Sequence, residues 1–462
     1  MLHLYNSLSR TREPLTTIEP GVVRLYVCGI TVYDYCHLGH ARFLIVFDMF
    51  VRFLRSQGWQ VRYVRNVTDI DDKIIKRAAD TGVDASEIAA RFTTAMSEDE
   101  AALGLVAPDV EPKATAHIDD IIAMIQALLD KGAAYVGDNR DVYYDVSTFA
   151  RYGALSGRDT SELRAGARIA VNESKDDPLD FVLWKPAKDG EPAWEAPWGA
   201  GRPGWHIECS AMSTCCLGQT FDIHGGGLDL QFPHHENEIA QSEAATGKPY
   251  VGLWMHNGFV TVDDEKMSKS LGNFLTVRDV LADYDAEAIR YFVLATHYRS
   301  PLAYNGPAMD AAGNALSRLY TTLRDAPRGG DASAEALADD RARFFAAMND
   351  DLNTPGAIAV LFDLARRANR SDDEKARADI VDLMRELGAT VGLLGQEPQA
   401  FLQGGAGDES ALSAATIETM LESRRDARRN KDFATADRIR DELTAAGITL
   451  EDSADGTKWR RD

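Results

Sequence analysis

The chain has 462 residues, more than one hydrophobic core normally organises, so about three or four structural units are expected. Its formal net charge of −22 excludes a nonspecific nucleic-acid binder, whose affinity would come from a broadly basic surface. Any contact with RNA would need local basic patches. No segment approaches the roughly 20 uninterrupted apolar residues that cross a bilayer, and the N-terminus lacks a secretory signal. A cytoplasmic location without a membrane partner is therefore expected.

The N-terminal region predicts a βαβ unit. The apolar, β-branched run 22–29 reads as a strand, a helical pattern covers 41–56, and a second strand is expected at 60–68. Two strands joined through a helix imply a parallel sheet. Its ligand site is expected at the carboxyl end of the first strand, where Cys28 and Gly29 lie.

The pattern changes after residue 115. A helix at 118–131 and a hairpin-like stretch near 134–146 indicate an insertion. Beyond Gly204 the earlier pattern resumes, with helices expected at 206–217 and 234–246 and strands at 220–224 and 252–256. After Pro301 the chain reads as helical.

The expected fold class is α/β: a Rossmann-like parallel-sheet catalytic domain split by an insertion, followed by a helical bundle and a small C-terminal domain. The expected boundaries are 1–114 and 204–300 for the two halves of the split domain, 115–203 for the connective insertion, 301–396 for the bundle, 397–410 for a linker and 411–462 for the C-terminal domain.

A short motif, His37-Leu38-Gly39-His40, lies between the first strand and the long helix. Helix N-termini attract phosphate through free N–H groups and the positive end of the dipole. Gly39 would let a nucleotide approach the backbone closely, and the two imidazoles, three residues apart, share a face. Such a histidine pair can equally be a structural helix cap, so the motif alone leaves both interpretations open.

A second motif, Lys266-Met267-Ser268-Lys269-Ser270, forms a polar loop in the second half of the split domain. Two lysines and two serines suit a phosphate clamp, because charge develops on a phosphoryl group only transiently. The alternative is a solvated basic turn. The presence of both motifs in one chain favours the clamp.

Four side chains form a candidate metal site: Cys28, Cys209, His234 and Glu238. On the helix expected from residue 234, positions i and i+4 share a face, which pairs His234 with Glu238 and makes His235 the poorer ligand. Two thiolates, an imidazole and a carboxylate suit zinc. Single cysteines and histidines far apart in sequence are usually structural, so the residues alone favour a structural role.

The two motifs, in this order on a split α/β domain, resemble the HIGH and KMSKS signatures of class I aminoacyl-tRNA synthetases. The first differs from the family pattern only at Leu38. The resemblance implies that His37 and His40, with Gly39 between them, contact the phosphates of Mg²⁺-bound ATP. It further implies that Lys269, with Lys266, stabilises the transition state of adenylate formation, and that Asp229 of the turn 227–229 holds adenosine or substrate.

The four metal-ligand candidates resemble, position by position, the zinc ligands of cysteinyl-tRNA synthetases. The resemblance implies one Zn²⁺ per chain, which selects the substrate through its thiolate. Cysteine differs from serine by sulfur for oxygen, a difference that hydrophobic fit discriminates only weakly. The resemblance also places Gly29, Thr68 and Trp205 around the amino acid, and His224 falls near the same crevice. Trp205 would equally suit a hydrophobic core.

Two C-terminal segments are candidates for contact with RNA. The segment 423–440 carries seven basic and three acidic residues, and its helical spacing predicts one basic face, although a solvated helix is the alternative. Trp459 in the tail is expected to be exposed and to stack on an unpaired base. Both segments resemble the anticodon-reading part of the family. The arginines of 151–168 are a further candidate, for contact with the acceptor stem.

The resemblance covers essentially the whole chain. It implies a cysteine–tRNA ligase activity, in which ATP, L-cysteine and tRNA(Cys) give L-cysteinyl-tRNA(Cys), AMP and diphosphate, by a chain expected to be a monomer. One alternative is a ligase that transfers cysteine to an amino-sugar, as in mycothiol synthesis, and lacks an anticodon-reading C-terminus. Another is a non-catalytic paralogue that binds zinc and tRNA.

Overall fold

The computed structural model describes residues 1–159, 175–188, 190–262, 265–266, 274–404, 412–453 and 456–461. These residues form two compact units. The first comprises Met1–Phe274, Tyr298–Leu302 and Asn349–Leu352, and the second comprises Leu275–His297, Ala303–Met348 and Asn353–Asp462. The domain boundaries expected from the sequence remain predictions.

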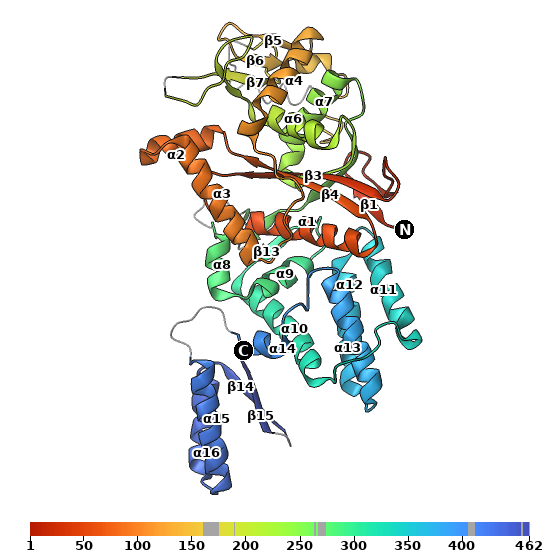
Figure 1. The fold of residues 1–462 in the computed structure, drawn as a ribbon, viewed down its shortest axis with the longest axis vertical. Helices are drawn as coiled ribbons and strands as arrows, with labels where there is room; N and C mark the ends of the chain where they lie inside the picture. The colour runs from red at the N-terminus through yellow and green to blue at the C-terminus, as the bar shows by residue number, and fades with distance from the viewer. Residues whose placement is uncertain are drawn as a thin grey trace. The chain divides into compact units, whose positions relative to one another are not determined.

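A four-stranded parallel sheet forms the centre of the first unit (Figure 1). Its strand order is β10-β9-β3-β4, which confirms the expected α/β fold class with a parallel sheet. Parallel sheets are covered on both faces, so their strands read as nearly continuous apolar runs. The strands are β3 (Val22–Thr31), β4 (Gln60–Thr68), β9 (Phe221–Gly227) and β10 (Val251–Asn257).

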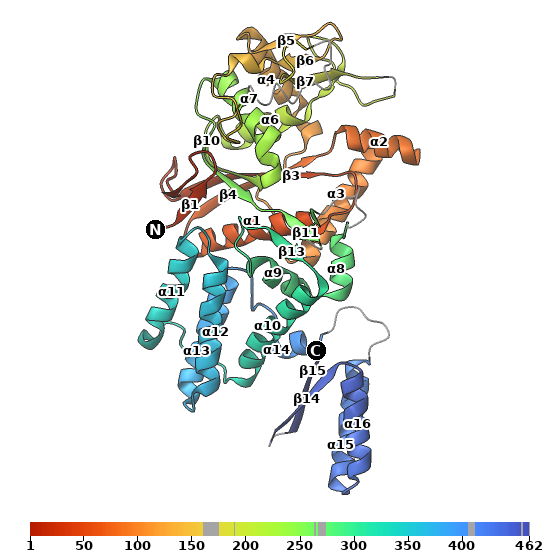
Figure 2. The same cartoon turned by 180° about the vertical axis from the view of Figure 1, so that it is seen from behind.

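Two helices cover the two faces of this sheet, as Figures 1 and 2 show. Helix α1 (Leu38–Ser56) begins three residues before the expected start and is apolar around most of its circumference. It approaches the sheet closely because β9 ends in glycines: a Cβ at Gly225 would lie 2.3 Å from a ring carbon of Phe47. Helix α6 (Trp205–Leu217) packs on the opposite face, where its side chains join the core formed by Tyr26 and Trp254.

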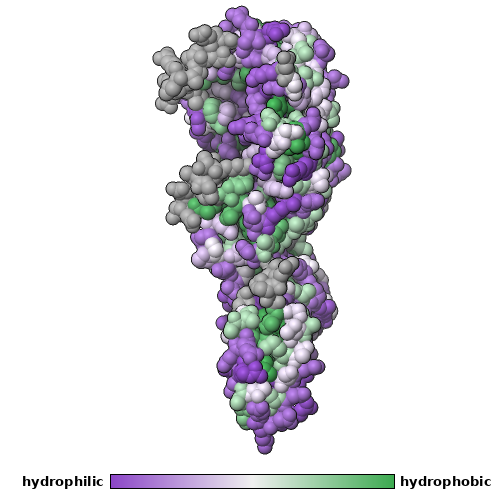
Figure 3. All heavy atoms as spheres, turned by 90° about the vertical axis from the view of Figure 1, so that its left-hand side faces the viewer, coloured by the Kyte–Doolittle hydropathy of each residue, from purple (hydrophilic) through white to green (hydrophobic). Residues whose placement is uncertain are grey.

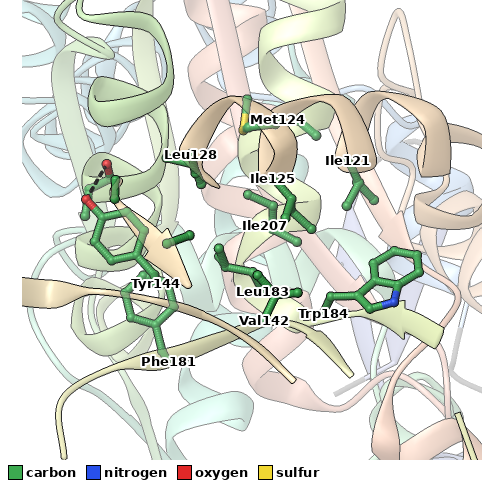
Figure 4. Close-up of a cluster of buried hydrophobic side chains, with 14 of the residues drawn as sticks. Ile121, Met124, Ile125, Leu128, Val142, Tyr144, Phe181, Leu183, Trp184 and Ile207 are labelled. Atoms are coloured by element: carbon green, nitrogen blue, oxygen red, sulfur yellow. Dashed lines mark hydrogen bonds between the residues drawn. The ribbon is translucent and has the colours of Figure 1, made fainter. Parts of the chain in front are cut away.

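The insertion between β4 and α6 carries its own antiparallel sheet, ordered β5-β6-β7-β8. Helix α4 (Ile118–Asp130) packs on it, and Figure 4 shows Ile125 of this helix beside Ile207 of α6, and Ile121 above Trp184 of β7. The helix and hairpin expected here are confirmed. The strands are β5 (Ala134–Val136), β6 (Val142–Tyr144), β7 (Phe181–Pro186) and β8 (Gly201–Pro203).

The remaining elements of the first unit are short or peripheral to the sheet. They are β1 (His3–Asn6), β2 (Thr11–Pro14), α2 (Asp72–Thr81), α3 (Ala85–Ala102), η1 (Ala114–His117), η2 (Val146–Thr148), η3 (Leu228–Leu230), η4 (Gln231–His235), α7 (Glu236–Thr246), β11 (Val260–Val262) and β12 (Glu265–Lys266). Strand β13 (Leu302–Tyr304) crosses the division between the units.

The second unit is mainly helical, as the sequence predicts. Its helices are α8 (Val277–Asp283), α9 (Ala286–Leu294), α10 (Gly306–Asp325), η6 (Glu335–Leu337), α11 (Ala338–Asn349), α12 (Thr354–Arg370), α13 (Glu374–Ala389), α14 (Pro398–Gln403), α15 (Ala414–Arg429) and α16 (Phe433–Ala445). The hairpin β14 (Ile448–Ser453) and β15 (Gly456–Arg461) follows them.

Two expectations about the C-terminal segments are wrong. The basic segment 423–440 is not one helix, because α15 ends at Arg429 and α16 begins at Phe433. Trp459 is not exposed: only 1% of its surface is accessible, and its indole N–H donates to Glu418 at 2.7 Å. The small α15–α16–hairpin core contains few large apolar side chains besides this indole, so the ring is needed for packing.

Figure 3 draws one face of the molecule, on which hydrophilic residues are spread widely with apolar areas between them. Among the described residues, no helix is both long enough and apolar enough to pass through a membrane.

Candidate active site

The structure brings the four predicted metal ligands together in a buried cluster. Cys28 lies on β3, Cys209 on α6, His234 in the turn before α7, and Glu238 on α7. One ligand atom from each lies within 4.8 Å of the others, and all four residues are buried. The two Sγ atoms are 3.6 Å apart, Cys28 Sγ lies 3.3 Å from Glu238 Oε1, and His234 Nε2 lies 3.1 Å from the same oxygen.

A bulge in β3 presents Cys28 to this cluster. The register between β3 and β4 shifts between Val27 and Ile30, as happens where a strand re-aims a side chain. Only glycine fits at position 29, because a Cβ there would lie 1.7 Å from the carbonyl oxygen of Asn66. The Gly29 N–H instead donates to Asn66 Oδ1 at 2.9 Å. Gly29 therefore fixes the backbone next to Cys28.

The charges of the cluster compensate one another inside the protein. Burial raises the pKa of Cys28 well above its ordinary value. The hydrogen bond from Cys28 lowers the pKa of Cys209 to about 6 despite burial, so the pair holds one proton and one thiolate. Burial opposes ionisation of Glu238 and of His234, but their mutual attraction prevails. The imidazoles of His224 and His234 lower the pKa of Glu238 well below normal, and Glu238 with Cys209 raises the pKa of His234 to about 10.

This donor chemistry fits a zinc ion. Thiolate, imidazole and carboxylate are zinc ligands, and a divalent cation would replace the protons that otherwise balance Cys28 and His234. His235, expected to be the poorer ligand, also lies close. It belongs to an overlapping set with Cys28, His224 and Glu238, but its Nδ1 lies 2.8 Å from His256 Nε2.

Further side chains orient the ligands from behind. Tyr250 O–H donates to Glu238 Oε2 at 3.0 Å, and His224 Nε2 lies 2.9 Å from the same oxygen. His206 Nδ1 lies 2.9 Å from His234 Nδ1, and Trp205 stacks on His234 with ring centroids 4.3 Å apart. Partners of this kind fix ligand orientation. Tyr250 was not predicted, because it follows a helix and a turn with no local sign of a role.

The cluster borders a cavity of about 310 Å³ at the carboxyl edge of the sheet. Its walls combine the predicted nucleotide motif, the predicted turn and part of the metal cluster. Of the predicted site residues, the described lining includes Cys28, Gly29, His37, Gly39, His40, Trp205 and Asp229, and it further includes Tyr33 and Lys73, which were not predicted.

Other predicted site residues lie away from this lining. Thr68 is buried, and its Oγ1 accepts from Asn66 Nδ2 at 3.2 Å. His224 is fully buried behind Glu238. Neither is among the described residues that line the cavity. Lys269 and the side chain of Lys266 lie outside the described residues.

The histidine motif caps the helix and lines the cavity at the same time. His37 is the N-cap of α1: its Nδ1 accepts from the His40 N–H at 3.1 Å, and His40 Nδ1 accepts from the His37 N–H at 3.3 Å. The two rings stack with centroids 3.5 Å apart. This reciprocal capping box fixes the ring orientation, so the capping interpretation is confirmed, and the phosphate-binding interpretation stays a prediction.

Three family models match the chain in succession. The model described as tRNA synthetases class I (C) catalytic domain matches residues 14–314, the DALR domain matches 343–395, and the Cysteinyl-tRNA ligase anticodon binding domain matches 412–460. A cysteine–tRNA ligase of Thioalkalivibrio sulfidiphilus is 60% identical over 464 residues, with 100% of each chain covered. That of Pseudomonas aeruginosa is 55% identical over 462 residues, covering 100% of this chain and 99% of the relative.

Solved structures share the fold at low identity. Methionyl-tRNA synthetase of Mycobacterium tuberculosis in complex with methionyl-adenylate has a TM-score of 0.56 at 16% identity, covering 84% of this chain and 92% of that chain. The LeuRS–tRNA–LeuAMS ternary complex of Agrobacterium radiobacter K84 has a TM-score of 0.60 at 13% identity, covering 85% and 86%.

The parallel sheet, the cavity at its carboxyl edge and the catalytic-domain match define the fold of a class I aminoacyl-tRNA synthetase. The relatives that align over the whole chain identify one family within this class. Within it, the chain belongs to the cysteine–tRNA ligase family.

Proposed function

We propose that the chain activates L-cysteine with ATP and transfers the cysteinyl group to tRNA(Cys), and that a zinc ion selects the amino acid. One observation carries the zinc part of the proposal. Cys28 belongs to the buried donor cluster and also lines the cavity that His37 and His40 line. A side chain bound at the cluster would therefore lie in the same cavity as a bound nucleotide.

Cys28, Cys209, His234 and Glu238 would hold the zinc ion. A bound Zn²⁺ would supply a soft Lewis acid that takes a thiolate in preference to a neutral hydroxyl. This preference accounts for discrimination against serine, which shape alone provides only weakly. Trp205, stacked on His234 and lining the cavity, would form the wall against which the amino acid lies. Gly29 lines the same cavity. Thr68 and His224 are buried behind the residues that line it and would support them.

The nucleotide would bind at the start of α1. His37, Gly39 and His40 line the cavity there, and the helix N-terminus favours phosphate. Asp229 would accept hydrogen bonds from ribose hydroxyls or from the substrate ammonium. Lys266 and Lys269 would stabilise charge on the phosphates of ATP, which enters with Mg²⁺.

The reaction needs no side-chain nucleophile. The cysteine carboxylate attacks the α-phosphate of ATP and releases diphosphate, and a ribose hydroxyl of the terminal adenosine of tRNA(Cys) then takes the cysteinyl group and releases AMP. Positioning and electrostatic stabilisation would supply the rate enhancement.

The match to an anticodon-binding domain over 412–460 favours tRNA over an amino-sugar acceptor. Basic residues in this region would contribute to the contact. Arg424 and Arg428 share one carboxylate, that of Asp452, so this carboxylate offsets part of the positive charge that they would bring to the contact. We further propose a monomer that acts in the cytoplasm.

Cysteine-dependent ATP–pyrophosphate exchange tests the proposal. We expect exchange with cysteine and not with serine, lost on removal of metal and restored by Zn²⁺. Lys269→Ala should abolish exchange while cysteine binding persists. Exchange by metal-free protein at the zinc-loaded rate would contradict the role of zinc, and no exchange by folded, zinc-loaded protein would favour the non-catalytic paralogue.

A further inference from the structure

A second group of metal-binding side chains lies on the first unit, outside the buried cluster. It consists of His117, Asp120 and Cys215, and one ligand atom of each lies within 4.8 Å of the other two. The group shares no residue with the buried cluster. Its donors are an imidazole, a carboxylate and a thiol rather than carboxylates alone, which distinguishes it from a merely acidic surface.

Two packed helices hold these residues in place. His117 and Asp120 lie at the start of α4, and Cys215 lies in the last turn of α6. Ile121 of α4 and Ala211 of α6 belong to one hydrophobic core, and Figure 4 shows Ile125 of α4 beside Ile207 of α6. Cys215 follows Ala211 by four residues and so continues the face of α6 that meets α4. The spacing of the donors is therefore set by a rigid core.

The contacts within the group match shared binding of one ion. His117 Nδ1 lies 2.8 Å from Asp120 Oδ2, and Cys215 Sγ lies within 4.8 Å of a ligand atom of each of these two residues. His117 is the N-cap residue of α4 but makes no side-chain capping bond, so capping does not explain its orientation. The side chains of His117 and Asp120 are 18% and 47% exposed, which leaves an approach from solvent.

The exposure of Cys215 is unusual for a free cysteine. Free cysteine is among the residue types most often buried, but Cys215 is exposed and Cys216 is intermediate. Both lie in the last turn of α6, whose final residue, Leu217, is still buried in the core. Adjacent helix residues do not share a face, and Cys216 is not part of the group.

We propose that His117, Asp120 and Cys215 form a second, surface site for a borderline divalent cation such as Zn²⁺, with water completing the coordination. Three partly exposed donors bind more weakly than four buried ones. The site should therefore fill after the buried cluster and lose its ion first to a chelator. Bound metal would also protect the Cys215 thiol, since a coordinated thiolate is a poorer nucleophile than a free one.

Titration of the full-length protein with Zn²⁺ in competition with a chromophoric chelator tests this site. We expect about two equivalents per chain, one tight and one weaker. Cys215→Ser should remove the weaker equivalent, whereas Cys216→Ser, the same change one position along the helix, should keep it. Asp120→Asn should also lose it, while pyrophosphate exchange stays at the wild-type rate in all three variants.

A second readout does not depend on counting ions. Excess Zn²⁺ should slow alkylation of Cys215, followed by peptide mass spectrometry, and leave the rate at Cys216 unchanged. One equivalent in the wild-type protein would overturn the proposal. Two equivalents retained in Cys215→Ser would do the same by placing the weaker ion elsewhere, and loss in Cys216→Ser would overturn the assignment of ligands.

Discussion

Replacement of Gly29 by alanine tests how the backbone positions the metal cluster. The new Cβ would lie 1.7 Å from the carbonyl oxygen of Asn66, whereas real Cβ contacts essentially never fall below 3.0 Å. Strands β3 and β4, which carry Gly29 and Asn66, must therefore separate locally by about 1.3 Å. The neighbouring atoms are backbone and cannot swing aside as a flexible side chain would.

This shift is large compared with what a metal site tolerates. Ligand distances are held to within about 0.2 Å, and Cys28 is bonded directly to Gly29. We expect Gly29→Ala to weaken zinc binding by at least about tenfold to a hundredfold, the range seen when supporting contacts are lost. Overpacking between strands should also cost about 1–3 kcal/mol of stability.

Competition for Zn²⁺ with a chromophoric chelator measures the loss of zinc affinity, and thermal unfolding measures the loss of stability. Gly313→Ala in α10 is the matched control, because nothing lies within 4 Å of its Cβ position. The control should retain zinc and gain up to about 1 kcal/mol, since alanine is favoured over glycine inside a helix. Wild-type zinc affinity in Gly29→Ala would refute the reasoning that this glycine sets the position of Cys28.

Three further outcomes follow from the structure. Tyr250→Phe removes the O–H donor to Glu238 and should lower zinc affinity about tenfold. Tyr26→Phe is the control, because the Tyr26 hydroxyl has no hydrogen-bond partner among the described residues, and its zinc affinity should stay unchanged. Equal losses of affinity in both variants would contradict the role of Tyr250. Trp459→Ala should lower the stability of the C-terminal core by about 3–5 kcal/mol, so aminoacylation of tRNA should fall while pyrophosphate exchange persists. Parallel losses of both activities would argue against a role of Trp459 confined to this core. Because the pKa values of Cys28 and His234 are both raised, the metal-free site holds protons near neutral pH that zinc must displace. Zinc affinity should therefore rise with pH, by up to about a hundredfold per pH unit when two protons are displaced. Isothermal titration with Zn²⁺ at several pH values measures this dependence, and an affinity that does not change with pH would contradict the prediction.

The elements that the sequence predicted well are those specified by neighbouring residues. The βαβ pattern at the N-terminus depends on apolar periodicity within each segment, and it is confirmed by β3, α1 and β4. The pairing of His234 with Glu238 depends on one helical turn, and the structure places these side chains 3.1 Å apart. A cap such as His37 is likewise a local feature. Short-range geometry of this kind is carried by the order of residues alone.

Other features could not be predicted because they depend on packing between distant segments. Cys28 and Cys209 are 181 residues apart, and only the sheet with α6 on its face brings their sulfur atoms together. In sequence Trp459 stands among basic residues and reads as exposed, but the C-terminal core needs its indole to exclude water. Cys215 reads as buried, but it lies on a part of the last turn of α6 that the neighbouring segments leave exposed.

The sequence by itself determined the chemistry available to this protein: which donor side chains it carries, and which segments favour helix or strand. The tertiary structure decided which of these groups meet. That meeting depends on the burial of side chains from all parts of the chain at once, a cooperative gain in free energy that no local window of sequence contains.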